Sequence, residues 1–169
     1  MTLLRRALRH PRMQLYAFEA RPSLRPEIAR ATWGPLLAIA VAGTALYGAT
    51  LPGSSALGLL AVTGPPWGLF GPALAWITRR RISTCAHACL VTMAYGVGIL
   101  AVGAGINLLL GPGPRFILLW VGLSNGVMAL ALTRQLSTVG VRAWKTLGAW
   151  LLALDLPGLV LFLLLRGPR

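Results

Sequence analysis

A single carboxylate, that of Asp155, lies in the apolar C-terminal part of this 169-residue chain. Asp155 is far along the chain from the other two acidic residues, Glu19 and Glu27. It follows Lys145 by ten positions, which is ~15 Å along a helix, so a helix entering a bilayer near Lys145 places it near the midplane. An ionisable side chain at that depth is costly and is by default a functional candidate.

Asn125 is the polar side chain that the sequence places at the same depth on a neighbouring apolar run. Asn125 and Asp155 are therefore our candidate pair of midplane polar residues. Pro157 adds a third polar group, because a proline frees a backbone carbonyl one turn earlier. Two interpretations stay open, a structural hydrogen bond between helices and a proton or ion site. We favour the first, because a lone acid without a charged partner is a poor proton relay.

Cys85, His87 and Cys89 have the residue types of a metal site. On a helix, however, His87 is turned by about 200° from Cys85, so the three side chains do not converge. With two histidines and three acids in the whole chain, nucleophile–base sets and paired carboxylates are also missing. We therefore predict no catalytic residues, no metal and no cofactor, and we do not expect an enzyme.

The composition is that of an integral membrane protein. Apolar residues make up 56% of the chain, charged residues only 11%, and the mean hydropathy is +0.72. Soluble domains carry about a quarter charged residues, so a soluble enzyme, a disordered tail and a disulfide scaffold are excluded. The net charge of +13 does not indicate a nucleic-acid partner, because the basic residues lie between apolar runs of bilayer length.

Apolar runs long enough to cross a bilayer predict an all-α polytopic membrane bundle with five transmembrane helices. The expected spans are residues 33–51, 56–78, 82–110, 116–133 and 144–165. The second span contains Gly64-Pro65-Pro66 and Pro72. These prolines predict either a kinked helix or a re-entrant pair of half-helices, and the charge distribution favours the kinked span.

Basic residues set the expected orientation, because cytoplasmic loops carry the excess of Lys and Arg. With the N-terminus inside, all but three of the 16 Lys and Arg residues fall on the cytoplasmic side. The exceptions are Arg115, Arg166 and Arg169. We therefore expect the C-terminus outside, a basic cytoplasmic segment over residues 1–32 and a membrane domain over residues 33–169. The expected location is the inner (plasma) membrane of a bacterium.

Two basic clusters are candidates for contact with the membrane surface. An anionic inner leaflet would attract each arginine by about 1 kcal/mol, and the bilayer is therefore an expected partner. The alternative is that these charges only fix the orientation of the chain. The residues concerned are Arg5, Arg6, Arg9, Arg12, Arg79, Arg80 and Arg81.

Pairs of glycines four residues apart allow helices to approach closely. Gly64 and Gly68 form one pair and Gly122 and Gly126 another. Packing within the chain is one interpretation and is favoured, since a helix bundle needs such contacts. The other is a contact face for a second membrane protein or a second copy of this chain. Further glycines of the same kind are Gly43, Gly48, Gly96, Gly98, Gly103 and Gly105.

Two stretches resemble the Yip1-like family of small membrane proteins. One is Ala-Leu-Tyr-Gly at residues 45–48, and the other runs from Leu118 through Ser137 to Arg142-Ala143-Trp144. The resemblance also includes a basic cytoplasmic N-terminal segment and five spans. It implies a non-enzymatic helper of membrane trafficking or assembly, with no catalytic residues to carry over.

A non-catalytic scaffold, assembly helper or accessory subunit is thus the leading expectation for function. The alternative is a small transporter or channel with a midplane site at Asp155, because transporters bind ions where broken helices meet the midplane.

Overall fold

The computed structural model describes residues 11–49, 68–111 and 114–156. All regular secondary structure within these ranges is helical, as predicted. The elements, in chain order, are α2 (Pro11–Ala20), the 3₁₀ turn η1 (Pro22–Leu24), α3 (Arg25–Ala49), a short helix (Gly68–Thr78), α5 (Ile82–Leu110), α6 (Pro114–Ser137), α7 (Ala143–Trp150) and the π-helical turn η2 (Leu151–Asp155).

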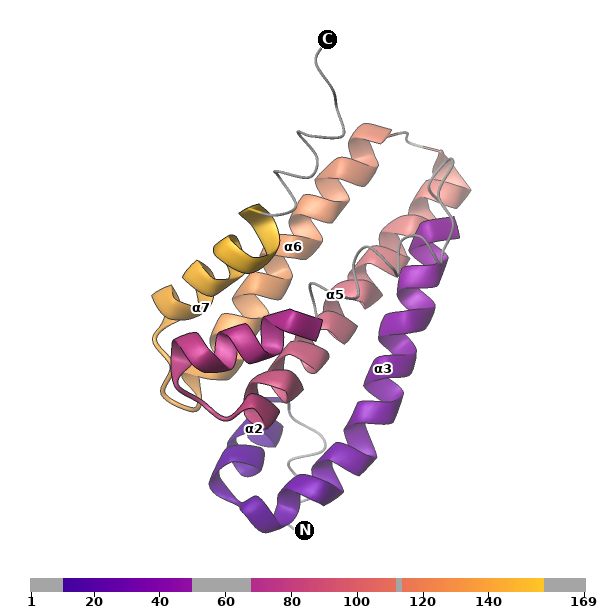
Figure 1. Cartoon of the computed structure of the whole chain (residues 1–169). Coiled ribbons are helices and arrows are strands. Elements are labelled where there is room, and N and C mark those ends of the chain that lie inside the picture. Colours follow the sequence, from indigo (N-terminus) through magenta and orange to yellow (C-terminus); the bar gives the residue numbers. More distant parts are fainter. Residues whose placement is uncertain (1–10, 50–67, 112–113, 157–169) are drawn as a thin grey trace.

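The long helices form a bundle with α5 at its centre. Helix α5 contacts α3 on one side and α6 on the other, and α6 in turn contacts α7. Figure 1 shows α2 lying across the lower end of this bundle, next to the start of α5. The N-terminal segment is therefore partly built into the bundle, and α3 runs through the domain boundary expected after residue 32.

Two helical stretches are long and apolar enough to cross a membrane, namely Pro22–Leu46 and Ile82–Leu110. The expected five spans stay a prediction. Helices also cover the described parts of the other expected runs. In the second run, the described helical residues Gly68–Thr78 are fewer than a bilayer span needs. Residues 56–67 of the second run and 157–165 of the fifth lie outside the described residues.

Prolines and one glycine lie at several helix boundaries. Pro22 begins η1 and Pro26 is the second residue of α3, so α2 and α3 are not one continuous helix. Helix α5 ends before Gly111, whose φ of +59° lies in the left-handed region. Its N–H donates to the carbonyl of Asn107, a common way to end a helix.

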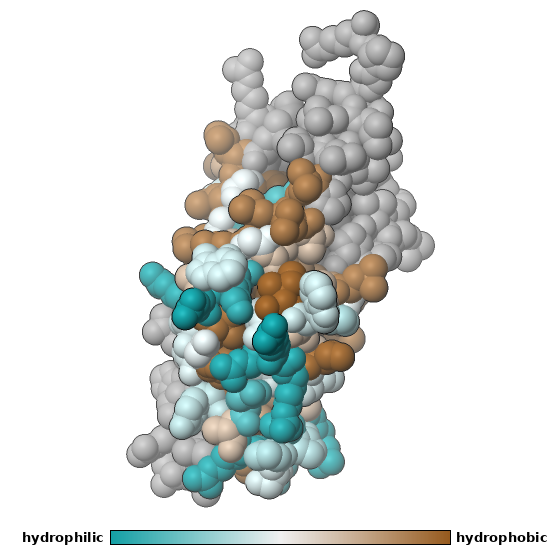
Figure 2. All heavy atoms as spheres, turned by 60° about the vertical axis from the view of Figure 1, so that its left-hand side comes forward, coloured by the Kyte–Doolittle hydropathy of each residue, from teal (hydrophilic) through white to brown (hydrophobic). Residues whose placement is uncertain are grey.

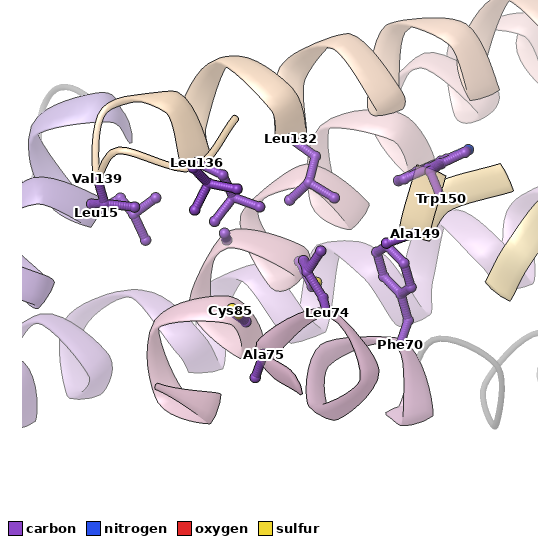
Figure 3. Close-up of a cluster of buried hydrophobic side chains, with 13 residues drawn as sticks. Leu15, Phe70, Leu74, Ala75, Cys85, Leu132, Leu136, Val139, Ala149 and Trp150 are labelled. Carbon is purple, nitrogen blue, oxygen red and sulfur yellow. The ribbon is translucent and has the colours of Figure 1, made fainter. Parts of the chain in front are cut away.

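A buried apolar cluster joins α2, α5, α6, α7 and the helix Gly68–Thr78. Figure 3 shows Leu15 of α2 next to Leu136 and Val139, while Phe70 meets Trp150 edge-on. The ring centroids of Phe70 and Trp150 are 5.7 Å apart and the rings are inclined at 86°. This cluster holds α2 against one end of the bundle.

Helices approach closely at three glycines, one between α3 and α5 and two between α5 and α6. A side chain at Gly43 would collide with Val97, one at Gly96 with Met128, and one at Gly103 with Trp120. By contrast, a methyl group at Gly68, Gly122 or Gly126 would meet nothing within 4 Å, and all three residues are exposed. Among the described residues, nothing therefore packs closely against these three glycines, and their role in helix packing stays a prediction. Gly64 lies outside the described residues.

Charge is segregated along the bundle. The basic residues whose side chains are described all lie near one end, at the starts of α3, α5 and α7 and the end of α6. Figure 2 shows this hydrophilic surface over the lower part of one face, with hydrophobic residues above it. The basic residues are Arg21, Arg25, Arg30, Arg79, Arg80, Arg81, Arg134, Arg142 and Lys145.

Gly103→Ala should destabilise the protein by about 1–3 kcal/mol, because the new methyl group must displace the Trp120 indole. The matched control is Gly122→Ala on α6, where the methyl group has open space and alanine gains up to about 1 kcal/mol of helix propensity. Thermal unfolding in detergent measures both. Equal stability of the two variants would contradict the packing described here.

Candidate functional site

Three polar side chains form a hydrogen-bonded chain between α6 and the last described helix. The indole N–H of Trp150 donates to Oδ1 of Asn125 at 3.1 Å. The Nδ2 of Asn125 donates to Oδ1 of Asp155 at 2.9 Å. The hydrogen bond expected between Asn125 and Asp155 is therefore present, and we call Asn125, Trp150 and Asp155 the polar triad.

The chemistry of the neighbours fixes how the Asn125 amide is oriented. An indole N–H can only donate, so it must face the amide oxygen. The amide nitrogen then faces the carboxyl group, whose oxygen accepts. Asn125 thus uses both ends of its side chain, and a residue lacking either a donor or an acceptor would break one link.

The π-helical turn η2 allows Trp150 and Asp155 to reach the same asparagine. In a regular α-helix, residues five apart are separated by about 140° around the axis and face different neighbours. Here the N–H of Leu156 donates to the carbonyl of Leu151, five residues earlier, so the turn is widened. Pro157 follows directly and has no N–H to donate, which favours a break in the α-helical pattern at this position.

Two further side chains of α6 donate to backbone carbonyls of α5. The hydroxyl of Ser124 lies 3.0 Å from the carbonyl oxygen of Gly96, and the indole nitrogen of Trp120 lies 2.6 Å from that of Ile99. Helix α6 is therefore hydrogen bonded to α5 on one side and to the triad partners on the other. The polar groups along its middle serve to join helices.

A second polar group, centred on Glu19, fastens α2 to the basic end of the bundle. Thr84 of α5 donates its hydroxyl proton to Oε2 of Glu19, and Arg80 forms an ion pair with Oε1 at 3.7 Å. Arg25 donates to the carbonyl oxygens of Phe18 and Glu19 at 2.6 and 3.1 Å. These polar contacts add to the apolar packing of Leu15 in holding α2 against α5.

The three residues that resemble a metal site do not assemble one. His87 is fully buried, its Nδ1 accepts the indole N–H of Trp33 at 3.0 Å, and its ring stacks on Phe18 at 4.9 Å. The Nδ1 lone pair is thus already used. Both cysteines are buried and free, and within the described ranges no three His, Cys, Asp or Glu side chains lie close enough to share a metal.

The basic residues predicted to touch the membrane surface have different environments. Arg80 is paired with Glu19, while Arg79 and Arg81 are exposed. Arg79 also has a φ of +55°, a left-handed conformation that allows the sharp turn into α5. Arg5, Arg6 and Arg9 lie outside the described residues, and so does the side chain of Arg12.

Trp150 and Glu19 are the site residues that the sequence reasoning missed. A signal for Trp150 exists, since an indole N–H within an apolar run needs an acceptor. Glu19 is one of only three acids in a chain with a net charge of +13, so an ion pair with an arginine is the expected state.

Comparisons with protein-family models, with curated proteins and with solved structures give no match to this chain.

If the triad is structural, Asp155→Asn should fold and function almost as the wild type, because an amide oxygen can still accept from Asn125. Asp155→Leu should cost about 0.6 kcal/mol, with an upper limit near 1.7 kcal/mol, the range for one hydrogen bond between membrane helices. Thermal unfolding in detergent measures both. In a double-mutant cycle, Asn125→Leu and Asp155→Leu should be non-additive.

A folded Asp155→Asn protein that has lost a measurable wild-type activity, such as proton flux into liposomes, would contradict the structural role. It would indicate a titrating site, since asparagine keeps the hydrogen bond but cannot carry the charge.

Proposed function

We propose that the chain is a non-catalytic integral membrane protein that serves as a scaffold, assembly helper or accessory subunit of a larger membrane complex. The observation that carries the proposal is the outward face of α6. Gly122 and Gly126 lie there, four residues apart. Both are exposed, and a methyl group added at either would meet nothing within 4 Å. Small residues at this spacing let a second helix approach closely within a bilayer. The partner is a membrane protein or a second copy of this chain.

Large exposed apolar side chains flank these glycines and support the proposal. Leu119, Leu123 and Leu130 of α6 are 75%, 55% and 58% exposed. A water-soluble protein rarely displays so continuous an apolar surface, whereas lipid or a partner helix accepts it at no cost. Together with the two stretches long enough to cross a membrane, this surface supports a multi-pass location.

The position of the basic residues supports an orientation with the N-terminus in the cytoplasm. Their side chains gather at the end of the bundle where α3, α5 and α7 begin. The positive-inside rule assigns that end to the cytoplasmic face, beside an anionic leaflet. The resemblance to the Yip1-like family implies the same class of function, a helper of membrane assembly or trafficking.

A small transporter or channel is the second candidate, and the π-helical turn favours it. Such turns often occur at functional sites, and this one ends at Asp155, which is partly exposed. A proton or cation would bind the carboxylate oxygen that does not face Asn125. The proline-rich second run would supply the broken helix typical of such sites.

Affinity purification of the full chain in a mild detergent separates the two candidates. The scaffold proposal predicts a stoichiometric partner or a homodimer, and Gly126→Leu should weaken that association about tenfold by blocking close approach. The matched control is Gly34→Leu, an exposed glycine on α3 whose added side chain also meets open space. A monomer that catalyses proton-coupled flux in liposomes would instead support the transporter.

Cysteine labelling in intact cells tests the orientation, using variants that each carry one accessible thiol. Cys85 and Cys89 are buried, so they contribute little background. Thr138→Cys, in the exposed turn after α6, should react only after the membrane is opened. Ser54→Cys should react with a membrane-impermeant reagent from outside. The reverse pattern would overturn the proposed topology.

A further inference from the structure

An apolar pocket opens between α3, α5 and the start of the helix Gly68–Thr78. Its volume is about 380 Å³, within the range of pockets that bind small molecules. Trp33, Leu37 and Val41 of α3 form one wall, and Cys89 and Met93 of α5 form part of another. Neither the polar triad nor the outward face of α6 contributes to it.

Two glycines leave space in the third wall of the pocket. Gly68, Gly71 and Pro72 line the pocket from the short helix. A methyl group placed at Gly68 would meet nothing within 4 Å, so the volume is open there. The pocket is therefore a concave feature between three helices and not a flat apolar surface.

The described lining residues offer almost no free hydrogen-bonding group to a polar ligand. Among the lining residues that the structure describes, Trp33 has the one indole N–H, and this group already donates to Nδ1 of His87 at 3.0 Å. A polar molecule entering the pocket would lose hydrogen bonds to water without gaining replacements. A flexible hydrocarbon chain loses none, so the pocket favours an aliphatic occupant.

Positive charge lies at one end of the same helix face. Arg30 is exposed and lies within about 20° of Leu37 and Val41 around the α3 axis, two turns closer to the basic end of the bundle. Trp33 lines the pocket between these levels, and tryptophan is the residue that prefers the headgroup boundary of a bilayer. The order along α3 is thus cation, boundary residue and apolar pocket.

We propose that this pocket binds one acyl chain of an anionic phospholipid, with Arg30 contacting the headgroup phosphate. Arg30, Trp33 and the apolar pocket follow one another along α3. They match the phosphate, the headgroup boundary and the acyl chain of such a lipid, in that order. The site is separate from the α6 face and rests only on the membrane location in the proposed function. A bound lipid would fill the space between α3 and the helix Gly68–Thr78.

Native mass spectrometry of the full chain in detergent tests the proposal, with dioleoyl phosphatidylglycerol as the probe and dioleoyl phosphatidylcholine as the neutral-headgroup control. The wild type should bind one phosphatidylglycerol in preference to phosphatidylcholine. Leu37→Trp fills the pocket and should weaken binding of both lipids about tenfold. The matched control, Ile39→Trp, is equally exposed to lipid on α3 but does not line the pocket and should bind as the wild type.

Arg30→Gln should keep the acyl-chain site but lose the preference for the anionic lipid. Gly68→Leu fills the pocket from another helix and provides a second filled variant if Leu37→Trp fails to fold. Equal lipid binding by the wild type and a folded filled variant would overturn the pocket assignment. A preference that survives Arg30→Gln would overturn the headgroup contact.

Alkaline extraction of membranes separates this test from that of the proposed function. Wild type and Leu37→Trp should both stay in the membrane pellet. If they do and the filled variant still binds lipid like the wild type, the pocket proposal alone fails. Release of the wild type by alkali would overturn the membrane location and with it the lipid site.

Discussion

The close approach of α5 and α6 at Gly96 is the contact on which the bundle depends. Because Gly96 has no side chain, Met128 fits against it and the hydroxyl of Ser124 reaches its carbonyl at 3.0 Å. One position thus provides both steric fit and a polar link. The same arrangement recurs two turns along, where Trp120 packs against Gly103 and donates to Ile99. In an apolar environment such contacts replace the hydrophobic driving force of a soluble core.

The polar triad depends on this contact, because α6 must be held in one rotation for Asn125 to face α7. Ser124 and Asn125 are adjacent and therefore point about 100° apart, one toward α5 and one toward Asp155. The hydrogen bond of Ser124 to α5 therefore orients Asn125 toward Asp155. The outward direction of Gly122 and Gly126 follows from the same rotation, so the proposed contact face and the internal hydrogen bonds are set together.

Much of this arrangement could be predicted from the sequence, and the failures have identifiable causes. The apolar run 82–110 and its stop at Gly111 predicted α5 correctly, and matching depths predicted the bond between Asn125 and Asp155. Glycine spacing could not tell an inward face from an outward one, since both have the same period. Trp150 was missed because regular helical geometry turns it away from Asp155, and only the π-helical turn brings both to Asn125.

The packing of α2 has a consequence for the order in which the chain folds during synthesis. Leu15 lies in the same buried cluster as Leu132 and Leu136, and Glu19 pairs with Arg80 and Thr84, all made much later. At about 5–20 residues per second, the ribosome needs on the order of ten seconds to supply those partners. Helix α2, the first of the described helices to be synthesised, is therefore among the last to settle. During that interval its apolar side chains lack the partners that bury them in the folded bundle.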